Sequence, residues 1–363
     1  MSPPLVVYGA GVRFDDVPGT DHHLVRHLAR HVDVWWVDPP VSVLRPRGRP
    51  GACGDGVRRV PVTTTPLPSR PGGRVLARAA TALTVRRLLR RDGRTPLAVV
   101  SARPEPHLRD LPARCHVYYA TDDFVAGAGL LGLSERGLRH AERRSLARAD
   151  LAVAVTPLLQ ARWGPAVPSM VLPNGCDSTR YAGVPDPDPV TEPVAAVVGQ
   201  LSARIDLALL EAVVDRGRRL LLVGPADPSL DRPRFDRLVE RPEVTWLGRR
   251  PASELPALLS GVKVGLTPYT DTAFNRASHP LKTLEYLAAG RAVVSTPLPA
   301  VATLACPAVA TGATPEAFAD AVDRALDAPD DSASVAGRKA FAARHDWGVR
   351  AQTLLVEITR VAR

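Results

Sequence analysis

Lys282 and Glu285 stand three residues apart near the start of a predicted helix, on nearly the same face. This helix is expected to begin at Pro280, whose missing N–H is harmless at the first helical position, and to end at Gly290, which suits a left-handed cap. The free amides of Leu281–Thr283 favour a bound anion, and Lys282 adds a point charge for phosphate. Glu285, one turn deeper, could accept hydrogen bonds from ribose hydroxyls. The pattern fits the two ends of a sugar nucleotide.

A purely structural role also explains this helix. Its apolar positions, such as Leu284 and Leu287, fit an ordinary core, and Lys282 and Glu285 then form an exposed ion pair. The helix by itself leaves both interpretations open.

A second cationic loop follows a strand expected at residues 194–198. Gly199 ends this strand, and Arg204 lies in the loop before a helix that runs to about Arg216. A guanidinium is suited to a diphosphate because it can donate two parallel hydrogen bonds. The sequence therefore predicts a second contributor to an anion site.

Two adjacent carboxylates, Asp122 and Asp123, follow a buried strand at residues 116–119. Open α/β sheets place their chemistry at the carboxyl ends of parallel strands. One aspartate could act as the base for a hydroxyl group, with its pKa tuned by the other. Capping of a loop or helix explains either residue equally well.

Strands and helices alternate through both halves of the chain, which predicts an α/β architecture with two doubly wound domains facing across a cleft. We expect an N-terminal domain at residues 1–185, a second domain at 194–345, and a helix at 346–363 that crosses back to the first. Residues 183–193 are rich in proline and form the linker.

The helix expected at about residues 74–91 has an apolar stripe formed by Val75, Leu76, Ala79, Leu83 and Leu88. Arg78, Arg86, Arg87, Arg90 and Arg91 lie largely opposite. A solvated basic face is one interpretation, and a patch that rests on an anionic membrane is the other. The arginines of the loop at residues 45–56 are open to the same two interpretations.

The 363 residues suffice for about two domains, and no apolar run reaches the length of a membrane helix. The start lacks the features of a signal peptide, so a cytoplasmic protein with four reduced cysteines is expected. The net charge of +10 comes almost entirely from arginine. Together with few aromatic residues and no recognisable binding motif, this argues against nucleic acid as the partner.

Residues 266–296 resemble the donor-site signature of the GT-B glycosyltransferases, in particular the family 4-like group and bacterial teichuronic-acid-type enzymes. The matching residues are Pro268-Tyr269, Ser278-His279-Pro280-Leu281-Lys282-Thr283-Leu284-Glu285-Tyr286-Leu287-Ala288-Ala289-Gly290 and Val293-Val294-Ser295-Thr296. The resemblance implies two Rossmann-like domains, a ribose bound by Glu285 and a diphosphate bound by amides at the helix start. The family pattern also has an acidic residue that contacts the sugar eight positions before Glu285. Here that position is Ala277, which leaves the sugar and the mode of catalysis open.

The resemblance extends to other segments. Gly199-Gln200-Leu201-Ser202-Ala203-Arg204-Ile205-Asp206 is similar to the opening of the family's donor domain, and Pro173-Asn174-Gly175-Cys176-Asp177 is similar to its segment before the hinge. In similar enzymes an acidic residue follows the strand that corresponds to residues 116–119 and faces the donor. The resemblance thus points to Asp122 or Asp123. The first strand–helix loop borders the acceptor site in this family, which makes Gly19, Asp21 and His22 candidates for acceptor binding.

These features favour a metal-independent glycosyltransferase that moves a sugar from a nucleoside diphosphate sugar to a hydroxyl or amine. It would need no cofactor, and its acceptor would be a small molecule, a glycan or a lipid-linked molecule, with peripheral contact to the inner face of the membrane. A sugar-nucleotide epimerase or pseudo-glycosyltransferase on the same fold is the first alternative. The second is a basic module that associates with membrane or nucleic acid without catalysis.

Overall fold

The computed structural model describes residues 3–16, 18–44, 51–52, 56–66, 71–104, 108, 110–165, 168–186 and 192–363. Most of the arginine-rich loop at 45–56 and part of the expected linker lie outside these residues. The chain divides into two compact units. Unit 1 comprises Met1–Pro173 and Trp347–Arg363, and unit 2 comprises Asn174–Asp346.

Unit 1 is built on a sheet with the strand order β10-β9-β8-β7-β1-β2-β5-β4. Its strands are β1 (Leu5–Gly9), β2 (Asp33–Val37), β4 (Gly51–Ala52), β5 (Val57–Val60), β7 (Ala98–Ser101), β8 (Cys115–Ala120), β9 (Leu151–Ala154) and β10 (Ser169–Val171). The pairs are parallel except β4 with β5, and β3 (Val41–Ser42) pairs separately with β6 (Thr63–Thr64). The chain adds strands on one side of β1 and then on the other, so the strand order reverses between β1 and β7.

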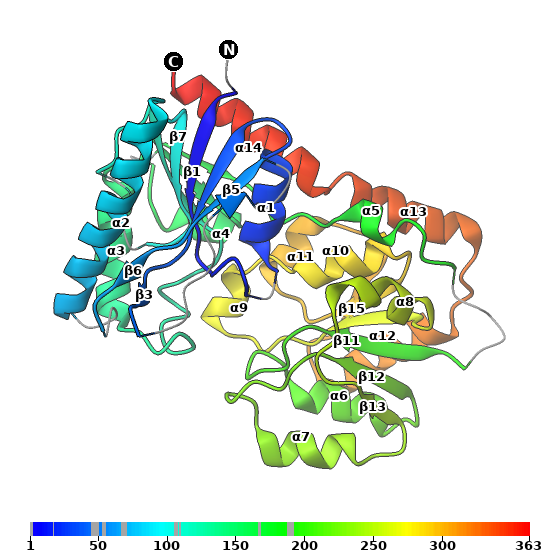
Figure 1. The fold of residues 1–363 in the computed structure, drawn as a ribbon. Coiled ribbons are helices and arrows are strands. Elements are labelled where there is room, and N and C mark those ends of the chain that lie inside the picture. The colour runs from blue at the N-terminus through cyan, green and yellow to red at the C-terminus, as the bar shows by residue number, and fades with distance from the viewer. Residues whose placement is uncertain are drawn as a thin grey trace. The chain divides into compact units, whose positions relative to one another are not determined.

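Helices cover both faces of this sheet (Figure 1). They are α1 (Thr20–Leu28), α2 (Pro71–Asp92), α3 (Glu135–Leu146), α4 (Pro157–Ala161) and α14 (Trp347–Val361). α14 packs against α1 and β8. α2 packs on the opposite face, where Val85 and Leu89 contact a core that includes Val7 and Val99. The register places Tyr118 of β8 on that same face, and its hydroxyl group donates to Glu142 of α3 at 3.3 Å.

The apolar stripe expected on α2 does not face the sheet. Val75, Leu76 and Leu83 are exposed, by 68%, 52% and 49%. The buried row runs at intervals of four residues through Ala77, Thr81, Val85 and Leu89. Thr81 is tolerated there because its hydroxyl donates to the carbonyl of Ala77 at 2.9 Å. The expected core-facing side of this helix was therefore wrong.

Unit 2 has a fully parallel sheet in the order β13-β12-β11-β14-β15-β16. The strands are β11 (Val194–Val198), β12 (Arg219–Val223), β13 (Val244–Trp246), β14 (Val264–Thr267), β15 (Ala292–Ser295) and β16 (Val309–Thr311). The order reverses between β11 and β14, which makes the carboxyl ends of these two strands the expected place for a ligand.

Apolar side chains alternate along β11, so both faces of this sheet are covered. Val197 packs with α6 (Leu207–Val214), α7 (Arg232–Val239) and α12 (Pro315–Asp327), whereas Val198 packs with helices on the other face. The remaining helices are α5 (Ser178–Tyr181), α8 (Leu255–Ser260), α9 (Ala273–Ala277), α10 (Leu281–Ala288), α11 (Pro299–Leu304) and α13 (Ser332–Ala343), with a 3₁₀ turn at Ala252–Glu254. The predicted class, two doubly wound α/β sheets, is confirmed.

Tyr286 fixes α10 on the unit 2 sheet. Its side chain is 1% exposed, and its hydroxyl oxygen accepts a hydrogen bond of 2.7 Å from the amide of Val198, the last residue of β11. The ring lies so close to β14 that a Cβ on Gly265 would be 2.2 Å from it. A glycine is therefore required at position 265 for α10 to reach this position.

Replacing Gly265 by alanine should destabilise unit 2 by about 3 kcal/mol, because a methyl group there overlaps the ring of a fully packed tyrosine. The thermal unfolding midpoint should fall clearly. Gly261→Ala is the matched control, since Gly261 has a negative φ and nothing within 4 Å of the added methyl group. Equal midpoints for the two variants would show that Tyr286 is not held against β14.

Candidate functional site

The Arg204 side chain is held in one orientation, with its terminal nitrogens left available. Its Nε donates to Asn275 Oδ1 at 2.7 Å, and its guanidinium carbon lies 5.3 Å from the ring centre of Tyr269 and 4.8 Å from that of Phe274. Among the described residues, neither terminal nitrogen of Arg204 has an acceptor. The residue is half-buried. A guanidinium fixed in this way is ready to bind a multivalent anion with little loss of side-chain entropy.

Asn275 orients Arg204 and is itself fixed by the neighbouring loop. It is 1% exposed, and its Nδ2 donates to the carbonyl and the hydroxyl oxygen of Thr270 at 2.8 and 3.0 Å. Asn275 belongs to α9, whose start is capped by the hydroxyl of Thr272. Neither this helix nor the role of Asn275 was predicted from the sequence. A threonine three residues before Asn275 was the available signal.

The start of α10 presents unpaired backbone donors. Pro280 is the N-cap rather than the first helical residue, one position away from the prediction, and no side chain caps the helix. The amides of Leu281–Thr283 donate to no acceptor in the described part of the chain. The Thr283 hydroxyl is also buried without a described partner. Asn174 Nδ2 donates to the carbonyl of His279 at 3.1 Å and thereby fixes the turn. This helix start can accept an anion.

Lys282 and Glu285 form an ion pair, with 2.6 Å between Nζ and Oε2. The Lys282 side chain is 23% exposed and that of Glu285 only 8%, so the pair is not the exposed surface pair of the structural interpretation. Tyr181 packs nearby, and burial together with the Glu285 carboxylate raises the pKa of Tyr181. Lys282 can therefore bind an anion only if its ion pair with the nearly buried Glu285 carboxylate is weakened or broken.

These groups lie along the carboxyl edge of the unit 2 sheet. Gly199 follows β11 and Tyr269 follows β14, the two strands between which the order reverses. A Cβ on Gly199 would be 3.6 Å from Lys282 Cε, so the lysine side chain extends over the end of β11. The chain is also tightly packed at this edge, because a Cβ on Gly224 would be 1.7 Å from the Gly199 carbonyl oxygen. The topology thus brings Gly199, Lys282 and the α10 start together.

Ala277 is the last residue of α9 and is 2% exposed. The position at which the resembling family has its second acidic residue is therefore buried in this chain. Asn275, two residues earlier, supplies the polar group of this segment and bonds to Arg204.

The two aspartates of unit 1 have different surroundings. Asp123 is 2% exposed, its Oδ1 accepts from the amide of Ala126 at 2.9 Å, and its Oδ2 is paired with Arg162. Arg162 also reaches Glu142 at 3.4 Å. Asp122 is half-buried. Both oxygens of Asp123 are thus engaged in building the turn, and Asp122 is the more accessible carboxylate.

The predicted acceptor residues lie around the start of α1. Gly19 is the N-cap of α1, and no atom lies within 4 Å of a Cβ placed on it. The His22 ring lies 4.7 Å from that of Trp36, and its Nε2 is 3.1 Å from the Phe14 carbonyl oxygen.

Asp21 is buried beneath the loop after β1. It accepts from the Tyr8 hydroxyl at 2.7 Å and from the Gly11 amide at 2.6 Å. Burial raises the pKa of Asp21, and these two hydrogen bonds oppose the shift. The carboxyl group therefore shapes the loop from beneath.

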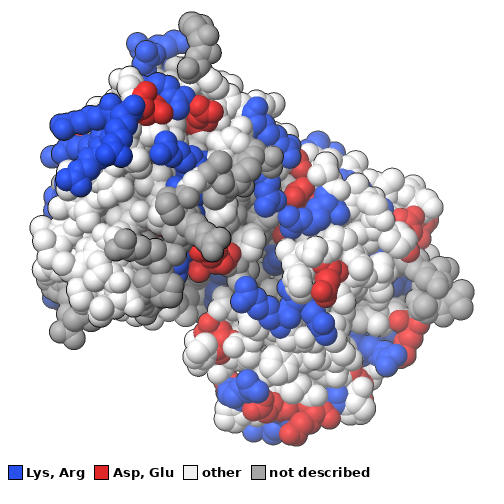
Figure 2. Space-filling view, viewed as in Figure 1, with Lys and Arg blue, Asp and Glu red and all other residues white. Residues whose placement is uncertain are grey.

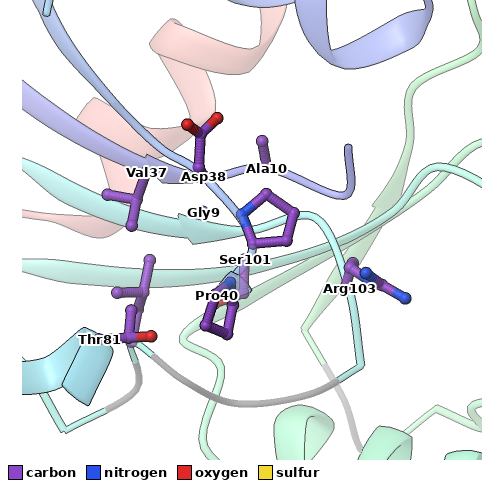
Figure 3. A pocket seen from close by; sticks show the side chains of 10 residues that line it. Gly9, Ala10, Val37, Asp38, Pro40, Thr81, Ser101 and Arg103 are labelled. Carbon is purple, nitrogen blue, oxygen red and sulfur yellow. The ribbon is translucent and has the colours of Figure 1, made fainter. Parts of the chain in front are cut away.

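A pocket lies at the carboxyl ends of β1, β2 and β7, where the strand order of unit 1 reverses (Figure 3). Its lining includes Gly9, Asp38, Ser101 and Arg103. Figure 3 shows Arg103 to one side of this pocket, away from Asp38. None of the three predicted acceptor residues lines it. Arg103, two residues after the end of β7, lines it and was not predicted.

Within the described residues, no group of three or more histidine, cysteine, aspartate or glutamate side chains could hold a metal ion. No helix in the described ranges is long and apolar enough to cross a bilayer.

Solved structures share this fold over the whole chain. Sucrose-phosphate synthase from Thermosynechococcus elongatus matches with a TM-score of 0.79 and 17% identity over 99% of both chains. Anabaena HepE, solved with UDP and glucose, matches with a TM-score of 0.70 and 16% identity over 98% of this chain and 99% of its own. The two doubly wound sheets are those of the GT-B class.

Residues 192–328 match the family described as "Glycosyl transferases group 1". The chain is 32% identical over 113 residues to the "Putative teichuronic acid biosynthesis glycosyltransferase TuaH" of Bacillus subtilis (strain 168). That alignment covers 31% of this chain and spans 28% of the length of the relative.

Asn275→Ala should weaken the binding of inorganic pyrophosphate roughly tenfold, because Arg204 loses the hydrogen bond that orients it. Asn275→Asp should also weaken binding, since a new carboxylate beside the guanidinium would compete with the anion. Calorimetry at constant salt measures both.

Arg276→Gln is the control for a general loss of positive charge. Arg276 lies next to Asn275 in α9, but it is exposed and pairs with Asp271. If Arg276→Gln weakens pyrophosphate binding as much as Asn275→Ala does, the orientation of Arg204 is not what matters.

Proposed function

We propose that this protein transfers a sugar from a nucleoside diphosphate sugar to an acceptor hydroxyl or amine. One observation carries the proposal. The guanidinium of Arg204, with two terminal nitrogens that have no acceptor among the described residues, lies on the same sheet edge as the uncapped start of α10. The match of residues 192–328 to the group 1 glycosyltransferases supports it.

The diphosphate is the group that these donors would bind. In glycosyl transfer the bond between the sugar and the diphosphate breaks, and negative charge accumulates on the leaving group. Arg204 would bind this charge with two parallel hydrogen bonds, and the amides of Leu281–Thr283 would add fixed dipoles. Lys282 would supply a further charge on the side of Gly199. Because these groups are already in place, they need little reorganisation as the charge develops.

Glu285 is suited to the ribose of the donor. Its carboxylate is nearly buried and one turn deeper than the amides, so it can accept hydrogen bonds from a pair of hydroxyl groups. In the absence of a ligand Lys282 neutralises it. When the diphosphate binds Lys282, ribose hydroxyls can replace part of the lost interaction, which couples recognition of the two parts of the nucleotide.

The acceptor would bind to unit 1, and Asp122 is the better candidate for its base. A half-buried carboxylate can reach a hydroxyl group, whereas Asp123 is committed to Ala126 and Arg162. A small molecule, a glycan and a lipid-linked molecule are the acceptor classes compatible with such a base. A lipid-linked acceptor would place the protein at the inner face of a membrane.

Substitutions at the donor site should separate the two halves of the nucleotide. Arg204→Ala and Lys282→Ala should weaken inorganic pyrophosphate and the preferred nucleoside diphosphate alike, roughly tenfold to a hundredfold. Glu285→Ala should weaken only the nucleoside diphosphate, because pyrophosphate has no ribose. Calorimetry measures both ligands, after a thermal-shift screen of UDP, GDP, dTDP and ADP has identified the base.

Arg204→Lys keeps the charge and removes the paired geometry, so its affinity should lie between wild type and Arg204→Ala. Near-normal affinity of Glu285→Ala for every nucleoside diphosphate would contradict the ribose assignment. Equal losses of pyrophosphate and nucleotide in that variant would also contradict it.

The two aspartates should respond differently to conversion to asparagine. Asp122→Asn should lower the rate of sugar transfer roughly a hundredfold or more and should lower the unfolding midpoint less than Asp123→Asn does, because Asp122 is the less buried of the two. Asp123→Asn should lower the midpoint by several degrees because it weakens the ion pair that a buried carboxylate makes with Arg162. A stable Asp123→Asn variant without transfer activity would reverse the two assignments.

A further inference from the structure

The exposed face of α2 carries apolar side chains first and then arginines along the helix. Val75 and Leu76 in its first half and Leu83 just beyond its midpoint are 68%, 52% and 49% exposed. Its second half carries arginines. Four of them are exposed, at positions Arg86, Arg87, Arg90 and Arg91. An exposed apolar group of this size on a soluble helix marks a surface that meets something other than water.

The basic half of α2 is not neutralised by the protein. Arg87, Arg90 and Arg91 have no hydrogen bond or ion pair with any described residue. Figure 2 shows a dense group of Lys and Arg side chains where the end of α2 lies in Figure 1. In unit 2, by contrast, most arginines form ion pairs with carboxylates. Arg218, for example, pairs with Asp323 and Asp327. The arginines of α2 are therefore available to an external anionic partner.

The segment around α3 repeats this order. Leu130 and Leu131, which are 50% and 45% exposed, precede the helix. Arg136, Arg143 and Arg144 follow on its exposed side, and none of the three is paired with a described residue. Exposed leucines followed along the chain by unpaired arginines thus occur twice in the described part of unit 1.

The two helices lie side by side on one face of the unit 1 sheet. Asp110 joins them, because its carboxylate pairs with Arg78 of α2 and with Arg148 just after α3, at 3.3 Å for the latter. Both helices lead from the carboxyl edge of the sheet back to its amino edge, so they run in the same direction. The first turns of both helices therefore lie toward the carboxyl edge of the sheet and their last turns toward its amino edge.

From this arrangement we propose that the α2–α3 face of unit 1, with Leu76 and Leu83 beside Arg87, Arg90 and Arg91, binds the surface of an anionic lipid bilayer. The leucines would enter the boundary between headgroups and acyl chains, and the arginines would bind lipid phosphates. A nucleic acid would use the arginines but leave the leucines in water, so the lipid surface fits the whole face better. The inference does not depend on the sugar-transfer reaction, since the face lies on α2 and α3 and includes no donor-site residue.

Co-sedimentation with vesicles tests this proposal. The full-length protein should bind vesicles of phosphatidylcholine and phosphatidylglycerol, bind pure phosphatidylcholine far more weakly, and lose affinity as salt increases. The triple variant Arg87→Gln, Arg90→Gln, Arg91→Gln should bind the mixed vesicles roughly a hundredfold more weakly. Leu76→Ser with Leu83→Ser should reduce binding at least tenfold, with the salt dependence retained.

The control with the same change in charge is Arg30→Gln, Arg237→Gln, Arg324→Gln. These arginines are also exposed and unpaired among the described residues, but they lie elsewhere. The control should bind like wild type, and melting curves should show that all variants are folded. Equal losses in both triple variants would reduce the effect to net charge and overturn the proposal. Binding to duplex DNA without binding to vesicles would assign the face to nucleic acid instead.

Discussion

The contact of Tyr286 with Gly265 and Val198 determines the geometry of the donor site. Because residue 265 has no side chain, the Tyr286 ring can lie directly on β14 and its hydroxyl can reach the last amide of β11. One buried side chain thereby fixes α10 to the two strands between which the sheet order reverses. The first turn of α10, including its unpaired amides and Lys282, takes its position from this contact, as a functional group held by rigid elements should.

Each cationic side chain of the donor site has a partner within unit 2 and can still bind an anion. The partner of Arg204 is a neutral amide, and that of Lys282 is a carboxylate. Arg204 is fixed through its Nε and by two aromatic rings, so its terminal nitrogens keep their full capacity. Lys282 instead neutralises a nearly buried carboxylate. The first arrangement favours rigid binding, whereas the second allows exchange between an internal and an external partner. Together they give a site that is stable when empty and still electropositive.

Much of this fold could be predicted from the sequence because runs of apolar residues and helix-ending glycines are local signals. Apolar residues predicted β11 at residues 194–198 with the bounds that the structure has, and the left-handed conformation expected of Gly290 is confirmed by its positive φ. Tertiary packing decided the failure at α2, which buries a row containing Thr81 and leaves Val75, Leu76 and Leu83 exposed. Asn275 was missed because its partner is 71 residues away, and no spacing rule reports such a contact. The roles of the site residues remain predictions.

The division of the chain has a consequence for its synthesis. Unit 2 is complete once Asp346 has left the ribosome, but unit 1 still lacks α14, which begins at Trp347. The Trp347 ring is fully buried and stacks on His23 of α1 at 5.8 Å. Until α14 has been synthesised, the surface of α1 that receives this helix is uncovered. The nascent polypeptide therefore carries a finished second unit and an unfinished first one, and chaperones would find their target in the portion made earliest.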